Sequence, residues 1–129
     1  MLAVVGTVPD ENFPLISGEV HLEKDRIHVC DKQVPVNRGT PAMLAAVIKA
    51  GEGLGLPPPL AYLVGDIGLG HGSRRLYDHL VRHLNRSPAG VITFHYLQPD
   101  VDWHNRVLFA VDEMPRRPLP LYRHYCVGP

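Results

Sequence analysis

Short apolar runs and one alternating stretch predict that the chain begins with β-strands. Residues 1–6 form an apolar run that is typical of a buried strand. Residues 18–30 alternate between apolar and polar positions on both sides of the polar sequence EKDR, which predicts a hairpin with one exposed face. Residues 34–36 can complete a third strand, and Pro35 there favours an edge position or a strand end.

The rest of the chain alternates between helical periodicity and short apolar runs. A helix is predicted to begin with Thr40 as its N-cap and Pro41 in its first turn, and to stop at the glycines and prolines of 53–59. A second helix follows Ser73, and a third runs from about residue 101 to Pro115. With strands expected at 60–64 and 91–97, this order predicts an α/β fold: a mostly parallel sheet with helices on both faces, in three layers, and a β-hairpin near the start.

Four loops are predicted to meet at one edge of this sheet, because ligands of such folds bind beyond the carboxyl ends of the strands. They span residues 6–10, 37–40, 65–73 and 98–104. Any ligand site is expected among them.

The loop after the apolar run at residues 60–64 is the strongest indication of a ligand site in the sequence. Its sequence, GDIGLGHGS, follows a strand and precedes a helix, which is the arrangement that holds anions against backbone N–H groups. It is neither a strict GxGxxG fingerprint nor a Walker loop. A tight strand-to-helix turn with no ligand is the alternative. The candidate ligand-binding residues are Gly65, Asp66, Gly68, Gly70, Gly72, Ser73 and Arg74.

Three of these residues suggest specific roles. Ser73 stands where an N-cap is expected. Arg74 and its neighbour Arg75 lie in the first helical turn, where the helix dipole disfavours cations by roughly 0.3–1 kcal/mol each unless an anion is bound. Arg74 is therefore the predicted anion partner. Asp66 could either accept hydrogen bonds from the N–H groups of its own loop or bind a substrate hydroxyl.

Other polar residues lie in the remaining loops. Asn37 and Arg38 could orient a polar ligand, although turn chemistry explains them equally well. His95, Asp100, Asp102 and His104 fall within ten residues, a composition that suits acid–base work or a metal. Their spacing matches no metal motif, so no metal site is predicted. Asp100 and His104 are kept as substrate contacts, with a helix N-cap as the simpler role for Asp100.

Composition limits the class of protein. Thirteen basic and thirteen acidic residues balance, which gives no general attraction to nucleic acid or to membranes. The last fourteen residues carry three arginines and no acid, which suggests a domain over 1–118 and a short basic tail over 119–129. The two cysteines are isolated, and the chain has no secretory signal or run of about 18 apolar residues. These features predict a soluble, cytoplasmic protein with free thiols.

Three segments resemble the first half of a ribokinase-like domain, and in particular the carbohydrate-kinase relatives of NAD(P)H-hydrate dehydratase. They are VNRGTPAMLAAVIKA, YLVGDIGLGHGSRRLYDHL and ITFHYLQPDVDWHNRVL. The resemblance extends over about residues 1–118. Asp66 and Ile67 depart from the family's usual loop, which has a proline there.

The resemblance implies use of ATP or ADP, with Mg²⁺, to phosphorylate a small alcohol or to dehydrate a damaged nicotinamide cofactor. It places Gly65, Gly68 and Gly70 near the ligand cleft. The family's Gly-Gly-Thr-Gly-Asp segment, which carries the catalytic aspartate, does not occur in this chain. We therefore expect a truncated, N-terminal portion that is not catalytic alone and that could associate with itself through an exposed sheet edge. The alternatives are a non-catalytic phosphate- or metabolite-binding module and a purely structural fragment.

Overall fold

The computed structural model describes residues 1–115 and 119–122. Its strands and helices are β1 (Leu2–Val8), β2 (Ile16–Glu23), β3 (Arg26–Val29), β4 (Lys32–Pro35), α1 (Gly39–Leu54), β5 (Leu60–Gly65), α2 (His71–His83), the 3₁₀ turn η1 (Leu84–Arg86), β6 (Val91–His95), α3 (Val101–Asp112) and β7 (Leu119–Tyr122). From β1 to α3, strands and helices follow one another along the chain in the order that the hydrophobic pattern predicts, and β7 is an additional strand.

The strands form one mixed sheet in the order β4-β3-β2-β5-β1-β6-β7. The four strands β5, β1, β6 and β7 are parallel to one another. The hairpin strands β2, β3 and β4 are antiparallel, and β2 also meets β5 in antiparallel register. The fold is therefore mixed α/β, and the predicted mostly parallel sheet is correct only for its β5-to-β7 part.

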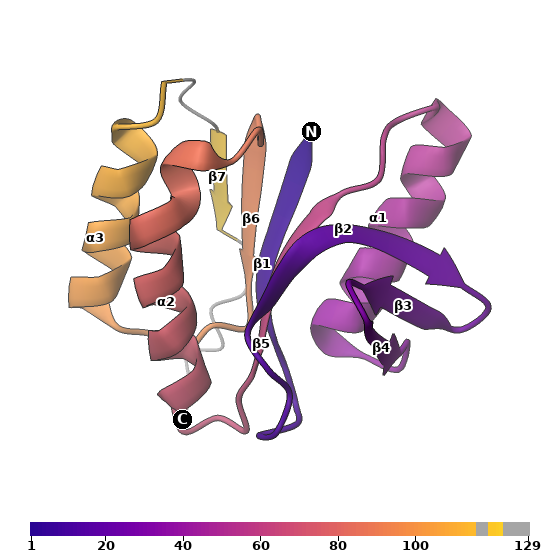
Figure 1. The fold of residues 1–129 in the computed structure, drawn as a ribbon, viewed down its shortest axis with the longest axis horizontal. Coiled ribbons are helices and arrows are strands. Elements are labelled where there is room, and N and C mark those ends of the chain that lie inside the picture. The colour runs from indigo at the N-terminus through magenta and orange to yellow at the C-terminus, as the bar shows by residue number, and fades with distance from the viewer. Residues whose placement is uncertain (116–118, 123–129) are drawn as a thin grey trace.

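Helices cover both faces of the parallel strands, with α1 on one side and α2 and α3 on the other (Figure 1). The handedness of crossovers explains this division. The chain moves one way across the sheet from β1 to β5, and the opposite way from β5 to β6 and on to β7. A right-handed connection must change face when its direction reverses.

Alternate residues of β1 supply the two apolar cores that result. Val4 and Val8 pack on the α1 side with residues of the hairpin. Ala3 and Val5 pack on the other side, among the buried residues of α2 and α3. Because all of β1 except Leu2 is buried, the strand is a near-continuous apolar run, as expected for a central parallel strand.

The predicted hairpin is confirmed. Val20 of β2 pairs with Val29 of β3, and Glu23 pairs with Arg26 across a two-residue turn. Lys24 in that turn has a φ of 57°. Val20 and Val29 are buried against the α1 side of the molecule, while the alternate positions face outward.

Two predicted helix starts are wrong. The N-cap of α1 is Arg38 and that of α2 is Gly70, whose φ of 90° suits glycine, so Thr40 and Ser73 lie inside the first turns. Neither hydroxyl caps its own helix, because that of Thr40 meets His95 at the end of β6 and that of Ser73 donates to Asp66 in the preceding loop. The end of α1 follows the prediction, with Gly55 in the left-handed conformation.

The sheet extends past the predicted domain boundary at residue 118. Residues 119–122, which the sequence assigns to a tail, form β7 beside β6. The rest of that tail lies outside the described residues, as do Arg116, Arg117 and Cys126. Within the described part, every helix is too short or too polar to cross a membrane.

Candidate functional site

The four predicted loops do meet at the carboxyl ends of the parallel strands. They enclose a pocket of about 370 Å³, which we call the switch-point pocket. Its walls come from the ends of β1, β5 and β6 and from the start of α1. The lining residues are Thr7, Pro9, Arg38, Gly39, Thr40, Asp66, Gly68, Tyr96 and Gln98.

The topology explains why a pocket forms there. From β1 the chain leads toward the hairpin and α1, whereas from the adjacent β6 it leads toward α3 on the opposite face (Figure 1). The two loops therefore diverge and leave a crevice between them. Such a switch point is the usual ligand site of open α/β sheets.

The glycine loop binds an anion, and the anion belongs to the chain itself. Oδ1 of Asp66 accepts hydrogen bonds from the backbone N–H groups of Gly68, Leu69 and Gly70, at 2.9, 3.1 and 3.2 Å. Its Oδ2 accepts from the N–H and the hydroxyl of Ser73, at 2.9 and 2.8 Å. A carboxylate has about four lone-pair sites, so these donors fill its acceptor capacity.

This cradle keeps Asp66 ionised. Burial alone would raise the pKa of its carboxyl, but the hydrogen bonds from the side chain and backbone of Ser73, and from the backbone of Gly70 and Gly68, outweigh burial and lower the pKa below its usual value. Of the two roles considered for Asp66, the geometry matches the local one. The loop N–H groups that seemed suited to a phosphate are already bonded.

Two glycines of the loop serve close packing. A Cβ on Gly72, in the first turn of α2, would collide with the carbonyl oxygen of Gly65. A Cβ on Gly65 would collide with the backbone of Asp10 and Phe13. The loop is therefore pressed against backbone on two sides, and α2 begins directly against the end of β5.

The predicted anion partner lies apart from the pocket. Arg74 is exposed, and it does not line the switch-point pocket. Its backbone N–H donates to the carbonyl of Gly70 within the first helical turn. The exposed cation that does line the pocket is Arg38, and no ion pair among the described residues involves it.

One lining residue of the pocket, Thr40, belongs to a buried polar pair. The hydroxyl of Thr40 and Nδ1 of His95 are 3.0 Å apart, and their residues are 1% and 9% exposed. Gly6 permits this contact, because a Cβ there would meet the Thr40 side chain at 2.6 Å. The pair joins the start of α1 to the end of β6.

Tyr96 is a site residue that sequence reasoning did not identify. It follows β6 with a φ of 56°, which is uncommon for a residue with a side chain and is often found at functional sites. Its carbonyl accepts a hydrogen bond of 2.8 Å from the Thr7 hydroxyl. The sequence signals nothing of this conformation. The position of Thr7, Pro9 and Gln98 in the predicted loops over residues 6–10 and 98–104 was the available signal.

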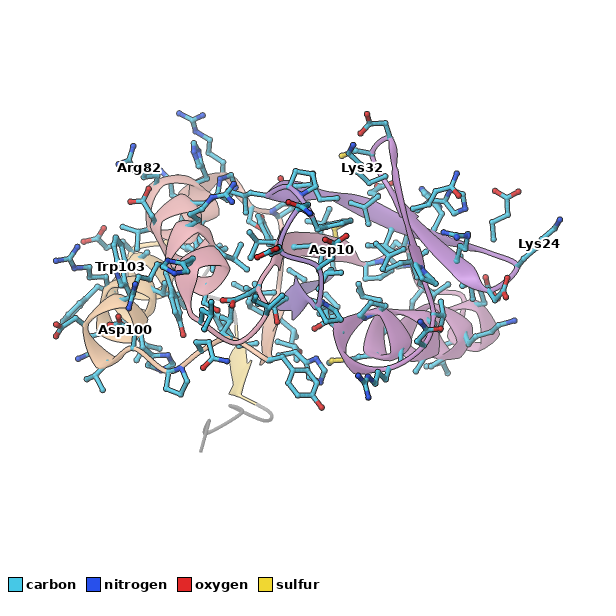
Figure 2. All side chains as sticks on the ribbon, turned by 90° about the horizontal axis from the view of Figure 1, so that it is seen from below. Asp10, Lys24, Lys32, Arg82, Asp100 and Trp103 are labelled. Carbon is cyan, nitrogen blue, oxygen red and sulfur yellow. The ribbon has the colours of Figure 1, made fainter. Side chains whose placement is uncertain are left out.

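The remaining predicted residues do not gather at the same place. Asn37 lines a neighbouring cavity of about 350 Å³ that shares Pro9 and Arg38 with the switch-point pocket. Asp100 and His104 line a separate open hollow of about 210 Å³. Figure 2, seen from the carboxyl ends of the parallel strands, shows Asp100 at the α3 side and Asp10 near the centre.

The histidines and aspartates that lie close in sequence between residues 95 and 104 do not form one cluster in the structure. His95 faces Thr40, while burial lowers the pKa of His104 on α3. In the described part of the chain, no three His, Cys, Asp or Glu side chains are arranged to hold one metal ion.

Asp100 caps α3, and its removal has a predictable cost. Its side chain accepts a 3.2 Å hydrogen bond from the N–H of Trp103. We expect Asp100→Ala to lower the free energy of unfolding by about 1 kcal/mol, the usual loss for an N-cap. Urea unfolding measures it, and Asp100→Ser, which keeps an acceptor, should restore most of the stability. Equal losses in both variants would contradict a capping role.

The fold and the pocket define a class: an open α/β domain with a crevice at a topological switch point. Comparison with models of known protein families, with curated protein sequences and with solved structures finds no match. The assignment of a function therefore depends on the site itself.

Proposed function

We propose that this chain is the N-terminal part of a ribokinase-like, nucleotide-dependent small-molecule kinase or NAD(P)H-hydrate dehydratase, and that the switch-point pocket is its share of the substrate cleft. One observation carries the proposal. Each of the three segments that resemble the family contributes to the same pocket: Arg38 to Thr40 from the first, Asp66 and Gly68 from the second, and Tyr96 and Gln98 from the third. The hairpin that precedes α1 also agrees with the expected architecture.

The chemistry of the pocket favours a small polar ligand with a negative group. Arg38 is a cation without an ion-pair partner among the described residues, and Gln98 can both donate and accept. The Tyr96 ring and Pro9 give apolar walls against which a ring or carbon chain can pack. Asp66 contributes negative potential, but its oxygens are already saturated by the loop.

These contacts suit a substrate better than the nucleotide. The family resemblance implies ATP or ADP with Mg²⁺, yet the described residues do not fit a magnesium site. Asp66 is the carboxylate that lines the pocket, and five donors already occupy its oxygens. We therefore propose that the pocket takes the substrate.

A non-catalytic metabolite-binding module would use the same pocket, so it remains the second candidate. The structural alternative draws support from the cradle of Asp66, which gives the glycine loop a role without a ligand. Self-association through the edge of the sheet also remains a proposal. The β4 edge carries Lys32 and Pro35, which are residues that typically protect an edge from pairing.

Ligand-dependent stability tests the proposal. We expect at least one of the substrate-like ligands NADH, ribose 5-phosphate and ribose to raise the unfolding temperature, since a ligand at 100 times its Kd stabilises the native state by about 2.7 kcal/mol. ADP and ATP are tested beside them. Arg38→Gln should weaken binding of an anionic ligand at least tenfold. Arg74→Ala is the matched control, because Arg74 lies outside the pocket, and it should bind normally.

The outcomes separate a ligand-binding role from the structural alternative and test the location of the site. A cooperative transition that responds to none of these ligands would favour the structural alternative. Equal loss of binding in Arg38→Gln and Arg74→Ala would contradict the location of the site. Binding of substrate-like ligands without turnover is what both the N-terminal part of an enzyme and a binding module predict.

A further inference from the structure

Two histidines on α2 lie side by side, on a part of the helix that the pocket does not use. His79 and His83 are one helical turn apart, and their ring centroids are 4.5 Å from each other with an angle of 42° between the rings. His79 also packs against the ring of Tyr62 on β5, with centroids 6.1 Å apart. His79 is half-buried and His83 is exposed.

Imidazoles four residues apart on a helix can bind one metal ion together. We propose that His79 and His83 form a two-imidazole site for a borderline divalent cation, with Cu²⁺ bound most tightly and Ni²⁺ and Zn²⁺ more weakly. The described residues offer no third donor of the His, Cys or carboxylate type in position, so water would complete the coordination. Imidazole ligands select these ions over hard Mg²⁺ and Ca²⁺.

The surroundings of the pair hold the ring of His79 in place. Contact with Tyr62 restricts the ring, so less freedom is lost when the ion binds.

Nearby arginines limit the affinity. Arg82 lies between the two histidines in sequence, but its Nε donates to Oδ1 of Asp78 at 3.2 Å, and this ion pair offsets its charge. Figure 2 shows Arg82 on the outer side of α2. Arg75 and Arg86 lie one turn before and after the pair and add positive charge. We therefore expect weak binding, with selectivity among metal ions that comes from the two imidazole ligands.

Calorimetric titration of the chain, without a histidine tag, with CuCl₂ and NiCl₂ at pH 7.5 tests the proposal. One equivalent should bind to α2, and either His83→Gln or His79→Gln should raise the Kd at least tenfold. The matched control is His21→Gln with His28→Gln. These residues face each other across β2 and β3, and no ring contact joins them among the described residues. The control should bind with unchanged affinity.

Two results would overturn the site. Unchanged affinity in His83→Gln is one, and loss of binding in the hairpin control is the other. Because His83 is exposed, its variant is expected to fold even if His79→Gln does not. Broadening of ring-proton signals by substoichiometric Cu²⁺ gives an independent measurement: His79 and His83 should broaden first, and earlier broadening of His21 and His28 would contradict the proposal. The pocket and its proposed function do not depend on this result.

Discussion

Asp66→Asn is expected to lower the free energy of unfolding by about 3 kcal/mol. An asparagine oxygen can still accept from Gly68, Leu69 and Gly70, but its amide NH₂ would then face the N–H and hydroxyl of Ser73. Ser73 is 1% exposed, so its N–H would lose its partner away from water. A buried donor without a partner costs about 1–3 kcal/mol, and loss of hydrogen bonds to a charged acceptor adds to this.

Urea unfolding at pH 7 measures the effect, and Asp78→Asn serves as the control. Asp78 also accepts one side-chain hydrogen bond, from Arg82, but the Arg82 side chain is 70% exposed and that of Asp78 is 43% exposed. Its replacement should cost no more than about 0.5 kcal/mol. Similar losses in the two variants would mean that the cradle does not stabilise the fold.

Acid should remove the stabilisation that the ionised Asp66 side chain gives to the fold. Because its pKa is lower in the folded state than in the unfolded chain, its contribution is complete above the ordinary carboxyl value of about 3.9 and decreases as the pH falls below it. The stability difference between the native chain and Asp66→Asn should therefore narrow from pH 5 to pH 3. A difference that stays constant over this range would contradict the assigned pKa direction.

Gly72→Ala is expected to destabilise the fold by at least about 3 kcal/mol. The added Cβ would collide with the carbonyl oxygen of Gly65 and lie 3.1 Å from the Cβ of Asp66. Rotation of a side chain cannot relieve a collision with backbone. The start of α2 would have to move away from β5, and this would disturb the packing of Leu76 and Tyr77 in the core.

Gly53→Ala is the matched control, because it makes the same change in another helix. Nothing lies within 4 Å of a Cβ at Gly53, near the end of α1. Alanine should therefore raise the free energy of unfolding by roughly 0.5–1 kcal/mol. Thermal unfolding of both variants gives the comparison. A neutral Gly72→Ala would show that α2 can move away from the strand at little cost.

The loop that contains Asp66 and Gly72 shows how much of this site the sequence can predict. The pattern of GDIGLGHGS predicts a strand, a tight loop and a helix, and the structure has all three. The anion expected on the loop N–H groups was a bound ligand, whereas the structure places the carboxylate of Asp66 there. This local role for Asp66 was one of the two that the sequence left open. Local sequence could not decide between them, because the choice depends on how the loop folds back on itself.

The helix starts show the opposite case. Thr40 and Ser73 have the residue types and positions of N-caps, and a local argument selects them for that reason. In the structure, both hydroxyls form hydrogen bonds with other side chains instead. Thr40 meets His95 across the sheet, and Ser73 donates to Asp66 and accepts from the N–H of Gln98 at 3.0 Å. Bonds between residues far apart in sequence outweigh a local preference of about 1 kcal/mol.

Sequence alone determined the order of the strands and helices up to α3, the hairpin and the four loops that meet at one edge, because hydrophobic period and turn residues act over a few neighbours. The tertiary structure decided which loop residues share the pocket. It brought Arg38 and Tyr96 together with Asp66, and left Arg74, Asp100 and His104 elsewhere. The reason is geometric: the strand order β5-β1-β6 and the faces taken by the helices set these distances, and no local pattern encodes them.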